Sequence, residues 1–113
     1  MQTQQVKNEC AAAEQYIEKA ARLCQTSGNA PEELRNAVAA LEQESQQART
    51  TLAEEQNDNK IIACVDQLEK LADRAMQACR QGSNIDEQLQ QAVEQAHGVL
   101  SDIKHRVHEP AGA

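Results

Sequence analysis

Apolar residues recur at alternating steps of four and three in four separate segments of the chain, at residues 6–24, 34–52, 61–79 and 89–107. This spacing places the apolar side chains on one stripe of an α-helix. Ser45 is the one polar residue on the stripes, so the pattern predicts four amphipathic helices. The stripe residues are Val6, Cys10, Ala13, Ile17, Ala20, Cys24, Leu34, Val38, Leu41, Ser45, Ala48, Leu52, Ile61, Val65, Leu68, Ala72, Ala75, Cys79, Leu89, Val93, Ala96, Leu100, Ile103 and Val107.

The residues between the stripes favour short turns. Residues 27–31 contain a glycine and a proline, residues 82–84 begin with a glycine, and residues 57–59 read Asn-Asp-Asn. Asn and Asp side chains accept hydrogen bonds from the free N–H groups at a helix start, and an acidic residue at the third helical position strengthens such a cap. Because all three connections are short, consecutive helices are expected to be antiparallel neighbours. The predicted caps are Asn29 with Glu32, Asn84 with Glu87, and Asn57 or Asp58.

The two halves of the chain repeat each other at an offset of 55 residues. Every stripe position within residues 3–55 corresponds to a stripe position within residues 58–108. The sequence therefore predicts one all-α domain over residues 1–113, an antiparallel up-down-up-down four-helix bundle built from two repeated helical hairpins. Residues 109–113 are expected to form a frayed tail.

In antiparallel register, the stripes form layers in which large residues meet small ones. One layer combines Ile17 and Leu41 of the first hairpin with two alanines of the second, and the next layer reverses the sizes. This alternation keeps the core volume constant along the bundle. Small stripe residues are expected to let the helices approach closely, so we expect neither a cofactor nor a small-molecule ligand. The two layers are Ile17, Leu41, Ala72 and Ala96, and then Ala13, Ser45, Leu68 and Leu100.

The chain is acidic, with a net charge of -7, and its basic residues are scattered. Nucleic-acid backbones and anionic membranes both select clustered Lys and Arg, so we expect neither as a partner. The chain has one Tyr and no Phe or Trp, which removes base stacking. The polar N-terminus does not resemble a signal peptide, and no segment has the length of a membrane span. A cytoplasmic location is expected.

Three of the four cysteines lie on the stripes, and Cys64 lies beside one. In the layered arrangement, Cys24 and Cys79 share the layer nearest the two hairpin loops, and Cys10 and Cys64 lie near one level further along. Helices at diagonal corners of a bundle are normally too far apart for a disulfide. We therefore expect reduced thiols that act as small hydrophobic core residues, with a metal or thiol-redox site as the alternative. A disulfide would require a flattened bundle.

His97 and His105 could contribute to such a metal site. Glu94 and His97 have the spacing of a paired ligand in di-iron bundles, although the corresponding positions of the first hairpin lack it. Asp102, His105 and Glu109 share one helix face and could gather a surface ion. The simpler interpretation of that group is a solvated face with cations near a helix C-terminus.

The segment Ala96-His97-Gly98 on an expected four-helix bundle resembles the histidine phosphotransfer domains, in which an exposed helix histidine accepts a phosphoryl group. The resemblance implies that His97 is the acceptor. That family usually places a Lys and a Gly shortly after its histidine, whereas Gly98, Val99 and Leu100 follow here. Phosphotransfer is therefore the second alternative function.

Apolar residues also lie beside the stripes. Tyr16, Leu23 and Leu71 occupy equivalent flank positions, and Met76 lies on the other flank. These residues either widen the buried stripe or leave a groove for a partner helix, in which Tyr16, the single aromatic residue, is the best anchor. No catalytic motif stands out. The sequence predicts a non-enzymatic protein that acts by binding another protein, as an adaptor, chaperone or regulator.

Overall fold

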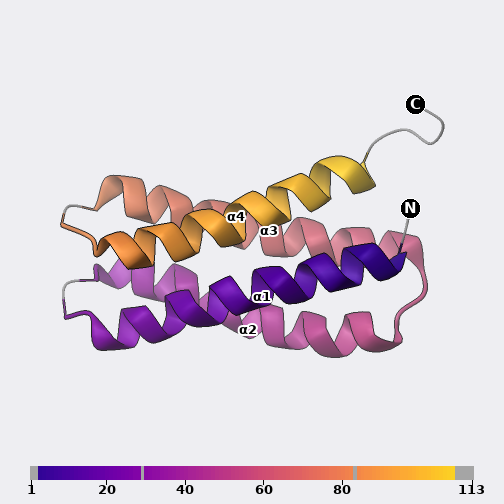
Figure 1. The fold of residues 1–113 in the computed structure, drawn as a ribbon, viewed down its shortest axis with the longest axis horizontal. Helices are drawn as coiled ribbons and strands as arrows, with labels where there is room; N and C mark the ends of the chain where they lie inside the picture. Colours follow the sequence, from indigo (N-terminus) through magenta and orange to yellow (C-terminus); the bar gives the residue numbers. More distant parts are fainter. Residues whose placement is uncertain (1–2, 29, 83, 109–113) are drawn as a thin grey trace.

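The protein is an all-α four-helix bundle. The computed structural model describes residues 3–28, 30–82 and 84–108. The helices are α1 (Thr3–Thr26), α2 (Glu32–Glu54), α3 (Asp58–Gln81) and α4 (Glu87–Val107), as Figure 1 shows. The predicted all-α four-helix bundle is confirmed, and the structural repeat of the two hairpins stays a prediction.

Each helix packs against two others: α1 and α3 both contact α2 and α4. Figure 1 shows the α1–α2 and α3–α4 connections at one end of the bundle and the α2–α3 connection at the other. Consecutive helices therefore run in opposite directions, and α1 and α3 occupy diagonal corners. None of the described helices combines the length and the hydropathy needed to cross a bilayer.

Polar caps begin two of the helices. Asn57 caps α3, and its side chain accepts hydrogen bonds from the N–H groups of Asn59 at 2.9 Å and Lys60 at 3.3 Å. The cap predicted for α4 was wrong, because Asp86 accepts from the Gln88 N–H at 2.7 Å. Asn84 instead adopts a left-handed backbone conformation (φ 59°) that turns the loop.

The start of α2 has no side-chain cap. Pro31 occupies its N-cap position, and its missing N–H costs no hydrogen bond there. The predicted cap residue Asn29 lies outside the described residues, as does the predicted tail at 109–113.

The stripes form the core. All stripe residues are buried except Val107, which is half-buried at the end of α4. In every other pair of stripe residues related by the 55-residue offset, both members are buried. The superposition of the two hairpins stays a prediction. Further residues are buried around the end of the bundle with the hairpin loops: Ala21, Ala37, Ala78, Ile85 and Ala92.

Candidate functional site

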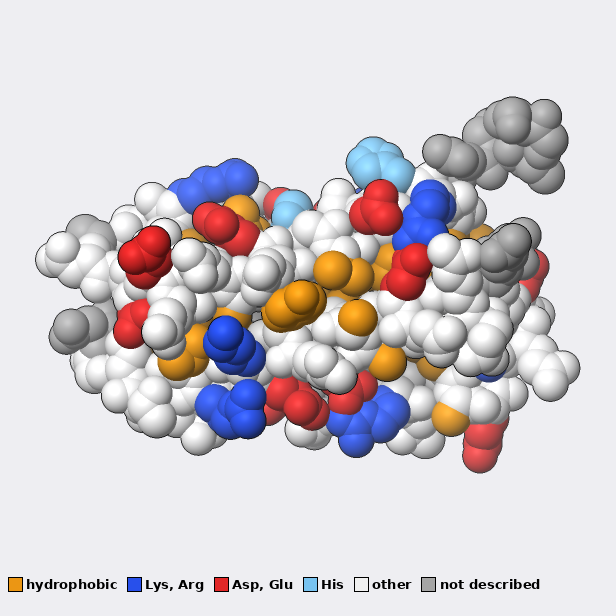
Figure 2. Space-filling model, in the orientation of Figure 1, with side chains coloured by type: hydrophobic (Ala, Val, Ile, Leu, Met, Phe, Trp, Pro, Cys, Tyr) orange, Lys and Arg blue, Asp and Glu red, His pale blue; other side chains and the backbone are white. Residues whose placement is uncertain are grey.

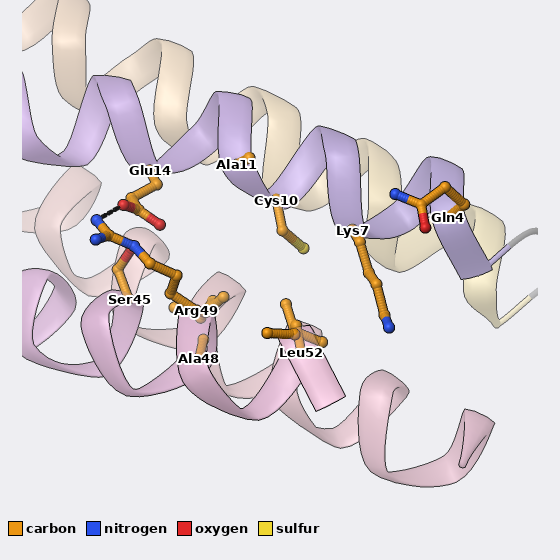
Figure 3. A pocket seen from close by; sticks show the side chains of 11 residues that line it. Gln4, Lys7, Cys10, Ala11, Glu14, Ser45, Ala48, Arg49 and Leu52 are labelled. Carbon is orange, nitrogen blue, oxygen red and sulfur yellow. Dashed lines mark hydrogen bonds and ion pairs between the residues drawn. The ribbon is translucent and has the colours of Figure 1, made fainter. Parts of the chain in front are cut away.

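A hollow opens between α1 and α2 in the half of the bundle that holds the N-terminus. Its volume is about 280 Å³, close to the lower end of the range for ligand pockets. We call it the terminal hollow. Figure 3 shows Cys10 of α1 pointing into it towards Leu52 of α2. It is lined by Gln4, Lys7, Cys10, Ala11, Glu14, Ser45, Ala48, Arg49, Leu52, Ala53 and Leu68.

Small side chains produce this hollow. Cys10, Ser45 and Ala48 are all buried stripe residues, and each is smaller than the residue at the corresponding position of the second hairpin. Small stripe residues were expected to let the helices approach closely, and at these positions open space remains between α1 and α2. The layers balance residue sizes across the whole bundle, but they do not balance them along the boundary between α1 and α2.

Ion pairs cross between α1 and α2 at the inner edge of the terminal hollow. Arg49 of α2 pairs with Glu14 and reaches Glu18 at 3.1 Å, as Figure 3 shows for Glu14. The Arg49 side chain is 60% exposed, so it forms a solvated bridge over the boundary. Lys7 is half-buried at the rim, and no carboxylate of the described residues forms an ion pair with it.

A second hollow, of about 160 Å³, lies on the same boundary nearer the hairpin loops. We call it the loop hollow. Arg35 stands at its rim and donates a hydrogen bond to the Ser27 carbonyl oxygen at 3.0 Å. The α1/α2 groove therefore consists of two hollows separated by the Arg49 bridge. The loop hollow is lined by Ala21, Cys24, Gln25, Arg35, Val38, Ala39 and Glu42.

The boundary between α3 and α4 is filled at the corresponding positions. Val65, Leu100 and Ile103 are completely buried where the first hairpin has Cys10, Ser45 and Ala48. Beside the loop hollow, Ala21 corresponds to the larger Met76, which packs on the core. The two hairpins therefore differ in side-chain size along this pair of boundaries.

Side-chain pairs also cover the α3/α4 boundary. The Asp66 carboxylate lies 2.8 Å from His108 Nε2, at the positions that correspond to Ala11 and Ala53 at the mouth of the terminal hollow. Lys104 pairs with Glu69 at 3.2 Å, which corresponds to the pair of Arg49 with Glu14. The charged bridge is thus common to both hairpins, whereas the open mouth is particular to the first.

All four cysteines are free, and Cys64 is half-buried while the others are buried. Burial, together with the nearby Cys64, raises the pKa of the Cys10 thiol to about 12. Burial also raises the pKa of Cys79 to about 11, with Cys24 and Glu94 adding to the effect. The pKa values of Cys24 and Cys64 are raised by burial as well. Since the thiolate is the form that attacks electrophiles and binds metals, these environments suit packing more than thiol chemistry.

In the described part of the chain, the histidines and cysteines do not form a metal site, because no group of three His, Cys, Asp or Glu side chains is placed so that it could hold a metal ion. His105 is exposed on α4. His97 is half-buried, and its Nε2 lies 3.7 Å from Glu69 and 3.5 Å from Asp73. Two carboxylates would repel a phosphoryl group at this ring nitrogen.

The four flank residues predicted to bind a partner lie on three different boundaries. Tyr16 and Leu23 follow Glu9 at seven-residue spacing, and Glu9 pairs with Arg106 of α4, so both face the α1/α4 boundary. Figure 2 shows hydrophobic side chains along the middle of this face, flanked by charged ones. Tyr16 and Leu23 are half-buried against the core.

The other two flank residues belong to α3. Met76 lies seven residues after Glu69, which pairs with Lys104 of α4. Leu71 lies seven residues after Cys64, and the pKa of the Cys64 thiol is raised by burial and by the charge of Glu44 on α2. Met76 therefore faces α4 and Leu71 faces α2. The structure does not bring the four residues together into one groove.

Comparison of the chain with protein-family models, with curated proteins and with solved structures gave no match. The geometry of the described residues is therefore the basis on which we assign a function. Cys10 and Cys24 were named from the sequence as candidate thiol or metal residues, but the other residues that line the α1/α2 groove were not predicted as a site. A position-by-position comparison at the 55-residue offset would have found them, because the first hairpin has the smaller residue at Cys10, Ser45 and Ala48 in turn.

Proposed function

We propose that this protein is a non-enzymatic binding module that recognises another protein through the α1/α2 groove. The observation that carries the proposal is the terminal hollow, whose walls are mostly apolar and whose mouth is open between two helices. An apolar side chain from a partner would remove this surface from water, at a gain of about 25 cal/mol per Å² buried. The roles of adaptor, chaperone and regulator all fit such a groove.

The other candidate functions receive less support from the geometry. A phosphotransfer histidine needs an exposed ring beside a cation, whereas His97 is half-buried beside two carboxylates. Thiol chemistry needs a stabilised thiolate, whereas burial raises the pKa of Cys10 and Cys79.

Photo-crosslinking in the source cells tests the proposal. A benzophenone amino acid replaces the exposed Ala53 at the mouth of the terminal hollow, and Ala63, exposed on α3, is the matched control position. We expect a defined polypeptide to be crosslinked from position 53 and not from position 63. The captured polypeptide, once purified, should bind the wild-type protein and lose at least tenfold in affinity for Ser45→Leu, which fills the hollow. Crosslinking from position 53 that equals the control, or binding that Ser45→Leu leaves unchanged, would contradict the proposal.

A further inference from the structure

The two hollows of the α1/α2 groove lie along the same face of α1. Cys10 lines the terminal hollow and Cys24 lines the loop hollow, and both belong to the same face of α1. They are separated by four turns of helix, about 21 Å at 1.5 Å per residue. The bridge of Arg49 with Glu14 and Glu18 lies between the hollows.

From this spacing we infer that the groove binds one amphipathic helix of a partner protein, which inserts two apolar side chains 14 residues apart. This inference rests on the proposed function and gives the partner its chemistry. Residues i, i+7 and i+14 of a helix lie on one face, so a single helix along the groove presents side chains to both hollows. Residue i+7 meets the Arg49 bridge, where a small residue such as Ala is needed.

The charges at the rims further define this partner. Lys7 at the terminal hollow and Arg35 at the loop hollow are both without an ion-pair partner among the described residues, in a chain of net charge -7. Glu42 also lines the loop hollow, so the preference for a carboxylate is stronger at the terminal hollow. A carboxylate within one turn of each apolar anchor would pair with these cations. The expected partner helix therefore has an acidic residue near each anchor, and this charge complementarity favours it over a basic or a purely apolar helix.

A synthetic peptide tests the inference with the full chain. The probe is a 21-residue fluorescein-labelled helix with Leu at positions 4 and 18, Ala at position 11, one Glu within a turn of each Leu, and Ala and Gln elsewhere. Its binding is measured by fluorescence anisotropy. A register control carries the second Leu at position 11, where it meets the bridge, and a charge control carries Lys in place of both Glu residues. We expect each control peptide to bind at least tenfold more weakly than the probe.

Variants of the protein locate the binding. Ser45→Leu and Ala21→Met introduce the residues that the second hairpin carries at the corresponding positions, and each should weaken binding of the probe at least tenfold. Ala63→Leu, which adds an apolar side chain on the exposed part of α3, should leave the affinity unchanged. Lys7→Glu should weaken binding of the probe and strengthen binding of the Lys-containing control peptide. Circular dichroism shows whether each variant keeps its helical content.

Three results would overturn the inference: equal affinity for the probe and the register control, binding unaffected by Ser45→Leu, or occupation of the groove by a second copy of the chain, seen as a dimer that Ser45→Leu dissociates. Failure of the inference is distinguishable from failure of the proposed function. A natural partner crosslinked from position 53 whose contact segment is not a helix would end the inference and leave the proposed function standing.

Discussion

The two intrahairpin boundaries of the bundle show how the same helical pattern gives a filled interface in one place and an open groove in another. Along α3/α4, Val65, Leu100 and Ile103 are completely buried. Along α1/α2, the corresponding smaller residues leave a hollow of about 280 Å³. The polar surfaces of both boundaries include a basic residue paired with a glutamate of the facing helix. The difference therefore lies in side-chain size, and it leaves open one boundary of the four-helix bundle, at which we propose that a partner binds.

The largest expected change in stability comes from placing a small residue of the α1/α2 boundary at the corresponding position of the filled α3/α4 boundary. Leu100→Ser replaces a fully buried leucine by the residue found at the corresponding position 45. The change leaves a cavity and buries a hydroxyl, so the free energy of unfolding should fall by about 3–5 kcal/mol. Urea unfolding followed by circular dichroism measures it. A loss below about 1 kcal/mol would mean that the α3/α4 boundary is not tightly filled.

A second prediction concerns pH, because the first hairpin has Cys10 where the second has Val65. Burial raises the pKa of the Cys10 thiol from 9.0 to about 12, so above pH 9 the unfolded chain loses this proton while the folded chain keeps it. The Cys10 thiol therefore does not lower the free energy of unfolding below pH 9. As the pH rises from 9 towards 12, ionisation of this thiol in the unfolded chain lowers the free energy of unfolding by up to about 1.4 kcal/mol per pH unit.

Cys10→Val should therefore reduce the loss of stability between pH 9 and pH 10.5. Urea unfolding under reducing conditions at several pH values measures the slope for both proteins. Parallel slopes for the wild type and the variant would show that the Cys10 thiol is ionised as readily in the folded state as in the unfolded state.

Filling the terminal hollow should have a smaller effect of the opposite sign. Ser45→Leu adds apolar side-chain surface in a space that is already open, so the free energy of unfolding should rise by about 1 kcal/mol. Thermal and urea unfolding measure the gain. Destabilisation by more than about 1 kcal/mol would show overpacking, and the hollow would then be too narrow to accept a partner's side chain.

The smallest effects are expected from the charged bridges that the two boundaries share. Arg49→Ala removes two ion pairs and Lys104→Ala removes the pair with Glu69, and the two basic side chains are 60% and 44% exposed. Each should cost about 0.5 kcal/mol or less, because exposed ion pairs contribute little. Urea unfolding of both variants and the wild type checks whether the two losses of stability are equally small. A loss above about 1.5 kcal/mol for Arg49→Ala alone would show that its ion pairs hold the open α1/α2 boundary together.

The sequence predicts the fold well because it depends on periodicity. The stripes mark the buried face of all four helices, and Val107, at the end of α4, is the one stripe residue that is not fully buried. The additional buried alanines, such as Ala37 and Ala92, escape the pattern because alanine is common on both faces of a helix. Asp86 was missed as a cap because the left-handed turn at Asn84 shifts the start of α4.

The candidate site was harder to predict because it depends on differences between equivalent positions. The layers predicted that Ser45 is balanced by Leu68 and Leu100, and all three are buried. That balance leaves the boundary between α1 and α2 short of volume, since the large residues belong to the other hairpin. The mouth of the hollow depends further on Ala11 and Ala53, which lie outside the stripes and carry no sequence signal of their own.

The most direct test of the account is chemical-shift mapping of the two-anchor peptide on the uniformly ¹⁵N-labelled protein. We expect the largest amide shift changes in α1 and α2 around Cys10, Cys24, Val38 and Ala48, with little change in α3 and α4 away from Leu68. Changes concentrated along α3/α4 or α1/α4 instead, or no saturable change at millimolar peptide, would contradict the claim that the α1/α2 groove is the binding surface.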